Sequence, residues 1–159
     1  MKLSTLMSFG ALVVVANVAS AQTATQSVTF QVTAINQIAV TGTPSLVINT
    51  ATAGSAPTSV TSSANTWSVT TNQSTAMITA SIPTAMPAGV TLSANLTAPA
   101  GATSLGLTAL TTTAVNVVTG ITKLNAAALG LTYQLDATAA AGVVSSGTRV
   151  VTYTITGGV

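Results

Sequence analysis

Few side chains in this chain of 159 residues could take part in catalysis or bind a metal ion. The charged residues are Lys2, Lys123, Arg149 and Asp136, and the chain contains no Glu, His or Cys. A nucleophilic triad needs His or Cys, and glycosidase chemistry needs two carboxylates. Metal sites are built mainly from His, Cys, Asp and Glu, of which this chain has one residue. We therefore predict a protein that is not an enzyme and has no cofactor and no bound metal.

Two kinds of chemistry remain formally open to Lys123. It could act with a Ser in a Ser–Lys dyad, although nothing in the sequence marks a partner Ser. It could also form an isopeptide bond to an Asn, a reaction that needs a buried Lys and Asn beside an acid, here Asp136. We favour the simpler interpretation, in which Lys123 is a solvated residue in a loop.

The composition favours a neutral protein that associates with itself. Charged residues make up 3% of the chain, whereas ordinary globular domains are about 25% charged. The polar surface must therefore consist mainly of Thr, Ser, Asn and Gln, and 32 residues are Thr. Soluble monomers usually avoid association through mixed surface charge, and nucleic-acid binding needs a basic patch. Because the chain has neither, we expect a homo-oligomer or polymer that does not bind nucleic acid.

The first 21 residues have the organisation of a secretory signal peptide. Lys2 precedes an apolar run from Leu6 to Val18, and residues 19–21 have the small side chains that a signal peptidase recognises. The run is shorter than the roughly 20 residues that span a bilayer; a retained N-terminal anchor is the alternative. We expect removal of residues 1–21, and a secreted or cell-surface protein, residues 22–159, without a membrane anchor.

Residues 22–159 are predicted to form a single β-domain. Apolar and polar residues alternate with a period of two, as in half-buried antiparallel strands, and Thr favours an extended backbone. Turns rich in Gly and Pro separate these segments. The pattern predicts an antiparallel, Ig-like β-sandwich of about 7–10 strands. The expected strands cover residues 28–33, 37–41, 46–49, 66–71, 76–82, 90–96, 114–119, 131–137 and 151–156.

Two finer expectations concern the C-terminal part of the chain. The segment Lys123–Leu129 is the one that could form a short helix, with Gly130 as its C-terminal cap. The last two strands are expected to pair with each other, connected by residues 139–147. Matching their apolar faces places Tyr133 opposite Tyr153.

Trp67 could bind carbohydrate, and two Asn residues could carry a glycan. An exposed Trp can stack on a sugar ring, but Trp67 alternates with Val69 in an expected strand, so we favour a place in the core. Asn72 and Asn95 each begin a sequence that matches the N-glycosylation motif, Asn-Gln-Ser and Asn-Leu-Thr. We expect Asn72 in a turn and Asn95 on a polar strand face, where a glycan could be attached to either.

The candidate assembly strand follows the cleavage site. Val28, Phe30 and Val32 alternate with polar residues inside the segment 26–36. Such a segment can add a strand to a neighbour's sheet, where main-chain hydrogen bonds give affinity and alternate side chains fill pockets. Pairing within its own sandwich is the alternative, and the sequence leaves both open.

These segments carry a resemblance to known proteins. The run Val28–Val32 after a signal peptide and the closing run Val150–Thr156 resemble the Ala/Thr-rich secreted β-proteins of bacteria and pilin-like subunits that donate an N-terminal strand. The resemblance implies an Ig-like sandwich, assembly into fibres and no catalytic residues, although the Cys pair of many chaperone-assembled pilins is absent. We therefore expect a structural subunit of an extracellular filament, pilus-like fibre or surface layer. The alternative is a secreted glycan-binding module or adhesin.

Overall fold

The structure is a computed structural model that describes residues 20–158, so nearly all of the expected signal peptide lies outside the described residues. The chain divides into two units, Met1–Val32 and Thr33–Val159. Residues 20–32 are exposed throughout and belong to no strand. The strand expected over residues 28–33 is therefore not formed within the single chain.

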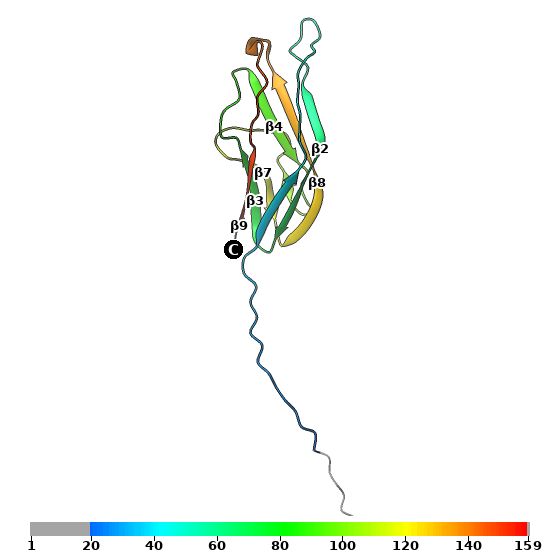
Figure 1. Cartoon of the computed structure of the whole chain (residues 1–159), viewed down its shortest axis with the longest axis vertical. Coiled ribbons are helices and arrows are strands. Elements are labelled where there is room, and N and C mark those ends of the chain that lie inside the picture. The colour runs from blue at the N-terminus through cyan, green and yellow to red at the C-terminus, as the bar shows by residue number, and fades with distance from the viewer. Residues whose placement is uncertain (1–19, 159) are drawn as a thin grey trace, which may run out of the picture. The chain divides into compact units, whose positions relative to one another are not determined.

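The second unit is an all-β sandwich of two antiparallel sheets (Figure 1). The five-stranded sheet has the order β1-β2-β8-β4-β6, and the four-stranded sheet has the order β5-β7-β3-β9. The strands are β1 Asn36–Thr41, β2 Val60–Thr71, β3 Ser74–Ser81, β4 Val90–Leu96, β5 Thr103–Ser104, β6 Thr108–Ala109, β7 Val115–Ile121, β8 Leu124–Ala137 and β9 Thr152–Gly158, with one 3-10 turn, η1, at Ala139–Ala141. The expected antiparallel β-sandwich is confirmed, with nine strands in the described part of the chain.

The core lies between the two sheets, and in β2 and β3 it is formed by alternate residues, as a period of two requires. In β4 and β7 adjacent residues are also buried. Trp67 belongs to the core, as expected, with 1% of its surface exposed. Its indole N–H donates a hydrogen bond to the carbonyl of Thr97 at 3.2 Å, which satisfies the one polar atom of the side chain. The other large side chains that are fully buried are Val69, Ile78, Ile82, Leu96, Val117, Val118, Ile121 and Leu131.

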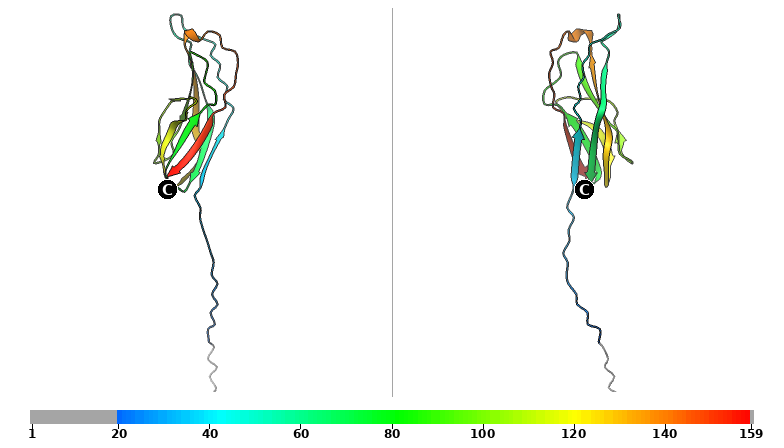
Figure 2. Two further views of the ribbon diagram at one scale, coloured as in Figure 1. Left: turned by 90° about the vertical axis from the view of Figure 1, so that its left-hand side faces the viewer. Right: turned by 45° about the vertical axis from the view of Figure 1, so that its right-hand side comes forward.

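The last two strands do not pair, and that expectation was wrong. Strand β8 lies between β2 and β4, whereas β9 pairs with β3 in the other sheet (Figure 2). Tyr153 lies opposite Ala80 of β3. The apolar face of β9 would match any inward-facing strand equally well, and the connection after β8 is long enough to cross between the sheets. Tyr133 and Tyr153 still meet, but across the core: the hydroxyl of Tyr153 donates to that of Tyr133 at 3.0 Å.

The expected short helix is also absent, because Lys123–Leu129 runs into the long strand β8. Leu124 and Ala126 pack partly buried against the core while β8 pairs with β2. A register shift follows, in which an extra residue is inserted into β8, and Ala128 there has a positive φ of 54°. Its N–H donates to the hydroxyl of Ser68, so the bulge keeps its backbone group satisfied.

The strand expected over residues 46–49 is replaced by a long loop, residues 42–59, which contains an isolated bridge between Ala51 and Pro57. Leu46 still packs partly buried against the core, whereas Val47 is exposed. Burial alternates along this segment as it would in a strand, because Ile48 is half-buried like Leu46, but no strand of the described chain pairs with it.

Stability should depend on the inward-facing residues of β3 and not on its outward-facing ones. Ile78 is fully buried, and its chain neighbour Met77 is 38% exposed on the other face. We expect Ile78→Ala to lower the free energy of unfolding by about 2–5 kcal/mol and Met77→Ala to lower it by less than about 1 kcal/mol. Urea denaturation of the two variants measures this, and equal losses would mean that the faces of β3 are wrongly assigned.

The tyrosine pair should make stability depend on pH only in the alkaline range. Burial raises the pKa of Tyr133, although the hydrogen bond from Tyr153 partly lowers it, and burial together with Tyr133 raises the pKa of Tyr153 strongly. The fold thus keeps both protons where the unfolded chain, with Tyr pKa values of about 10, releases them. We expect a constant free energy of unfolding from pH 5 to 9, because the chain contains no His and no Cys, and a fall above about pH 10. The double variant Tyr133→Phe, Tyr153→Phe should lose most of that fall in urea titrations at each pH.

Candidate assembly site

The residues predicted to form the assembly strand are large apolar side chains that are exposed in the described part of the first unit, residues 20–32. Val28 is 76% exposed, Phe30 is 91% exposed and Val32 is 79% exposed. We call residues 22–32 the N-terminal arm. The period of two gives the arm one apolar face when it is extended, and a contiguous exposed apolar patch is typical of an interaction site.

At one end of the second unit the chain passes twice between the two sheets. Strand β2 passes to β3 through Asn72-Gln73, and β7 passes to β8 through Thr122-Lys123. The two connections lie side by side, because the N–H of Lys123 donates to the carbonyl of Gln73 at 3.0 Å. We call this end of the sandwich the arch end.

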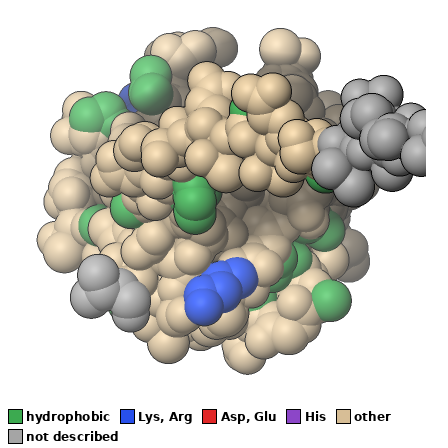
Figure 3. All heavy atoms as spheres, turned by 90° about the horizontal axis from the view of Figure 1, so that it is seen from below, with side chains coloured by type: hydrophobic (Ala, Val, Ile, Leu, Met, Phe, Trp, Pro, Cys, Tyr) green, Lys and Arg blue, Asp and Glu red, His purple; other side chains and the backbone are tan. Residues whose placement is uncertain are grey.

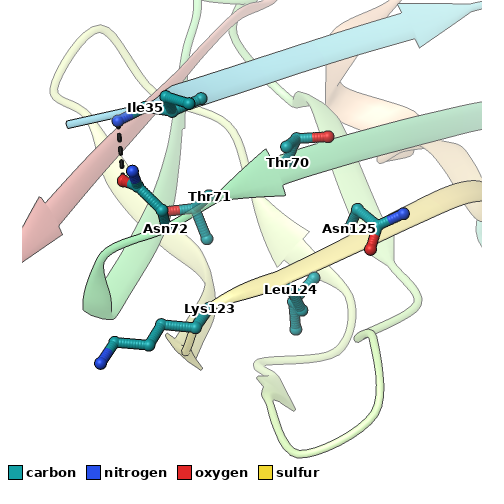
Figure 4. A pocket seen from close by; sticks show the side chains of 7 residues that line it. All are labelled: Ile35, Thr70, Thr71, Asn72, Lys123, Leu124 and Asn125. Atoms are coloured by element: carbon teal, nitrogen blue, oxygen red, sulfur yellow. Dashed lines mark hydrogen bonds between the residues drawn. The ribbon is translucent and has the colours of Figure 1, made fainter. Parts of the chain in front are cut away.

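The side chain of Asn72 fixes the segment from which the arm departs (Figure 4). Its Oδ1 accepts from the N–H of Ile35 at 2.8 Å, and its Nδ2 donates to the carbonyl of Thr33 at 2.7 Å. The N–H of Asn72 itself donates to the carbonyl of Ile35 at 3.2 Å. The amide therefore takes the place of a neighbouring strand for residues 33–35 and holds them extended.

The two sheets are joined at the same end by close packing between β1 and β9. With its amide oriented to satisfy both neighbours, Asn36 donates to the hydroxyl of Thr71 and accepts from the N–H of Gly157 at 3.3 Å. A Cβ atom at Gly157 would lie 2.7 Å from both Asn36 and Gln73. Only glycine lets the backbone of β9 approach the start of β1 so closely.

An open pocket of about 500 Å³ lies at the arch end and is lined by Ile35, Thr70, Thr71, Asn72, Lys123, Leu124 and Asn125. Lys123 is exposed, and Figure 4 shows its side chain extending away from the other lining residues. Lys123 precedes the first residue of β8 and Asp136 is its penultimate residue, so about 40 Å of strand separates them. An isopeptide bond at Lys123 promoted by Asp136 is excluded by this distance.

The surface of the second unit is almost free of charge, as the composition requires. The face seen in Figure 3 consists mostly of polar side chains and backbone, with few apolar or basic groups and no acidic one. The carboxylate of Asp136 accepts bonds from Ser59 and Gln134, and the guanidinium of Arg149 donates to the carbonyls of Ala85 and Thr148. Both charged groups are therefore hydrogen-bonded to uncharged groups.

The two residues predicted as glycosylation sites differ in their surroundings. Asn72 is in a turn, as expected, but its Nδ2, the atom that would carry a glycan, is bonded to Thr33. Asn95 is half-buried in β4, and its Oδ1 accepts from the hydroxyl of Ser104 at 3.2 Å. Modification of either residue stays a prediction. We call the hydrogen bonds of the Asn72 side chain with Thr33 and Ile35 the clamp. This role of Asn72 was not predicted, because its sequence motif indicated glycosylation instead.

Within residues 20–158 no helix has the length and hydropathy needed to cross a bilayer. In comparisons with known proteins, no family model, no curated protein and no solved structure matches the chain.

The clamp can be tested at the amide of Ile35. Removing the side chain with Asn72→Ala deletes the acceptor for this N–H, and a lost hydrogen bond of about 1 kcal/mol corresponds to roughly fivefold weaker protection. We expect the amide of Ile35 to exchange with solvent about fivefold faster by NMR, while amides in the middle of β3 are unchanged.

Asn125→Ala is the matched control, because Asn125 is an exposed residue that lines the same pocket. It should leave exchange at Ile35 as in the unmodified protein. If the amide of Ile35 exchanged at an unchanged rate in Asn72→Ala, the side chain of Asn72 would not hold residues 33–35.

Proposed function

We propose that this chain is a secreted, non-catalytic structural subunit that polymerises into an extracellular filament, pilus-like fibre or surface layer. The arm of one copy adds a strand to the sandwich of another. The observation that carries the proposal is the exposure of three alternating apolar residues, Val28, Phe30 and Val32, on a segment that belongs to no strand.

The alternation is what makes strand addition the best interpretation of this exposure. An extended segment with apolar residues at every second position buries all of them at once when it joins a sheet edge. Burying a side chain the size of Val or Phe contributes about 1.5–3 kcal/mol. Backbone hydrogen bonds to the edge strand add to this and do not depend on charge.

The neutral surface supports the proposal independently. Natural proteins usually protect exposed strand edges with charged residues, especially Lys, or with Pro. The edge strands β1, β5, β6 and β9 contain no charged residue and no Pro. Nothing in these strands opposes edge-to-edge pairing between copies.

The alternative of a glycan-binding module receives less support. Trp67, the residue best suited to stack on a sugar ring, is buried and bonded to Thr97. Tyr133 is buried as well, and Tyr153 bonds to it. A sugar-binding platform would therefore have to be built without the Trp and without these two Tyr residues.

Electron microscopy of the mature protein, residues 22–159, tests the proposal with two matched variants. Phe30→Thr removes an apolar side chain from the arm and keeps a residue that favours strands. Gln31→Thr introduces the same residue on the polar face and removes no apolar side chain. We expect filaments from the unmodified protein and from Gln31→Thr, and an increase of about tenfold or more in the concentration that Phe30→Thr needs to assemble, since about 1.4 kcal/mol corresponds to a factor of ten.

Removal of residues 22–32 should abolish filaments and leave the sandwich folded, because the clamp begins at Thr33. Urea denaturation with an unchanged midpoint would show that the truncated domain is folded. Monodisperse particles of the full mature protein at every concentration would overturn the structural role.

A further inference from the structure

The two edge strands that are long enough to accept an arm lie on the same side of the sandwich. Strands β5 and β6 have two residues each, whereas β1 has six and β9 has seven. Both β1 and β9 have one neighbour in their own sheet and a second edge that no strand of the described chain pairs with. We call the side of the sandwich between β1 and β9 the seam.

The inward-facing side chains along the seam are only partly covered. Tyr153 and Ile155 of β9 are half-buried, although their partners in β3, Ala80 and Ile78, are fully buried. Val40 of β1 is 45% exposed although it lies opposite the buried Trp67. Ile38 is also only half-buried. The exposure begins at the outermost strand of each sheet, as expected where a further strand is missing.

The arm matches this seam in length, spacing and charge. Residues 28–32 extended cover about 16 Å, and the seven residues of β9 extend over about 23 Å. The apolar side chains Val28, Phe30 and Val32 have the same spacing as Val151, Tyr153 and Ile155. The arm and both edge strands contain no charged residue, so no charge loses its hydration on association.

The clamp decides which copy supplies the arm. Strand β1 starts beside the end of β9, since Asn36 contacts Gly157. For a chain to place its own residues 28–32 along β9, its backbone would have to reverse direction within residues 33–35. Asn72 bonds both Thr33 and Ile35 and holds that segment extended, so the reversal would break the clamp.

We propose that the seam is the acceptor site, and that residues 28–32 of a second copy of this chain add as a strand to the free edge of β9, with Phe30 covering the half-exposed side chains of β1 and β9. This inference rests on the proposed polymerisation by strand addition. It names where the arm binds and excludes the chain's own arm as the occupant.

Disulfide crosslinking tests the inference, because the natural chain has no Cys and every crosslink can be assigned. One protein carries Gln31→Cys, and a second carries Thr152→Cys, Thr154→Cys or Thr156→Cys, all on the exposed face of β9. The matched control is Thr103→Cys, an exposed residue of the other edge strand of the same sheet, β5. The proteins are mixed, allowed to assemble under reducing conditions, examined for filaments and then oxidised.

We expect a covalent heterodimer in high yield with one of the β9 variants, and at least tenfold less with Thr103→Cys. Filaments that crosslink through Thr103→Cys, or through neither edge, would overturn the seam as the acceptor and leave the proposed polymerisation intact. Absence of filaments from all variants and from the unmodified protein would instead count against the proposed function and the inference together.

A chain that carries both Gln31→Cys and the best β9 substitution distinguishes the two occupants. We expect it to yield covalent ladders of two or more subunits on a non-reducing gel. A monomeric product with an internal disulfide, shown by a mass two units lower, would mean that the arm enters its own seam and would overturn the second copy as its occupant.

Discussion

A sandwich with three charged side chains in its described part, Lys123, Asp136 and Arg149, depends on backbone hydrogen bonding and apolar packing for its stability. Ion pairs contribute little at most protein surfaces in any case, but charge has a second use, which is to keep strand edges from pairing with other molecules. The edge strands of this sandwich have no such protective charge. The edges of β1 and β9 are open and neutral, and the apolar side chains beside them are half-covered. The same composition therefore holds the domain together by packing and leaves it suited to bind another strand.

Neutral hydrogen bonds take over the tasks that ion pairs perform elsewhere. Asn72 binds residues 33–35 through both ends of its amide, and the hydroxyls of Tyr133 and Tyr153 join the two sheets through the core. Amides and hydroxyls lose less hydration energy on burial than charged groups do. Such contacts are also less sensitive to salt than ion pairs.

The sequence pattern was sufficient for the strands that obey a simple period of two, and insufficient where long-range pairing decides. Strands β1, β4 and β9 lie within a residue or two of their expected places. The first half of β8 resembled a helix, because the bulge at Ala128 shifts the alternation between Leu124, Ala126 and Leu129. Its pairing with β2 overrides the helix propensity of its Ala residues. The partner of β9 could not be derived either, since an apolar face specifies which side is buried and not which strand lies beside it.

The candidate site also combines a part that the sequence predicted with a part that depends on long-range contacts. The arm was visible in the sequence because alternation is a local property, whereas the clamp and the seam join residues more than thirty positions apart, such as Ile35 and Asn72 or Asn36 and Gly157. The clamp matters for a reason of entropy. Fixing the backbone of each residue costs about 1–2 kcal/mol of conformational entropy. If every residue before β1 were free, the cost of ordering them would offset much of the free energy gained by adding a strand. Because Asn72 already orders residues 33–35 in the single subunit, the ordering cost of the proposed assembly falls on residues 22–32 alone.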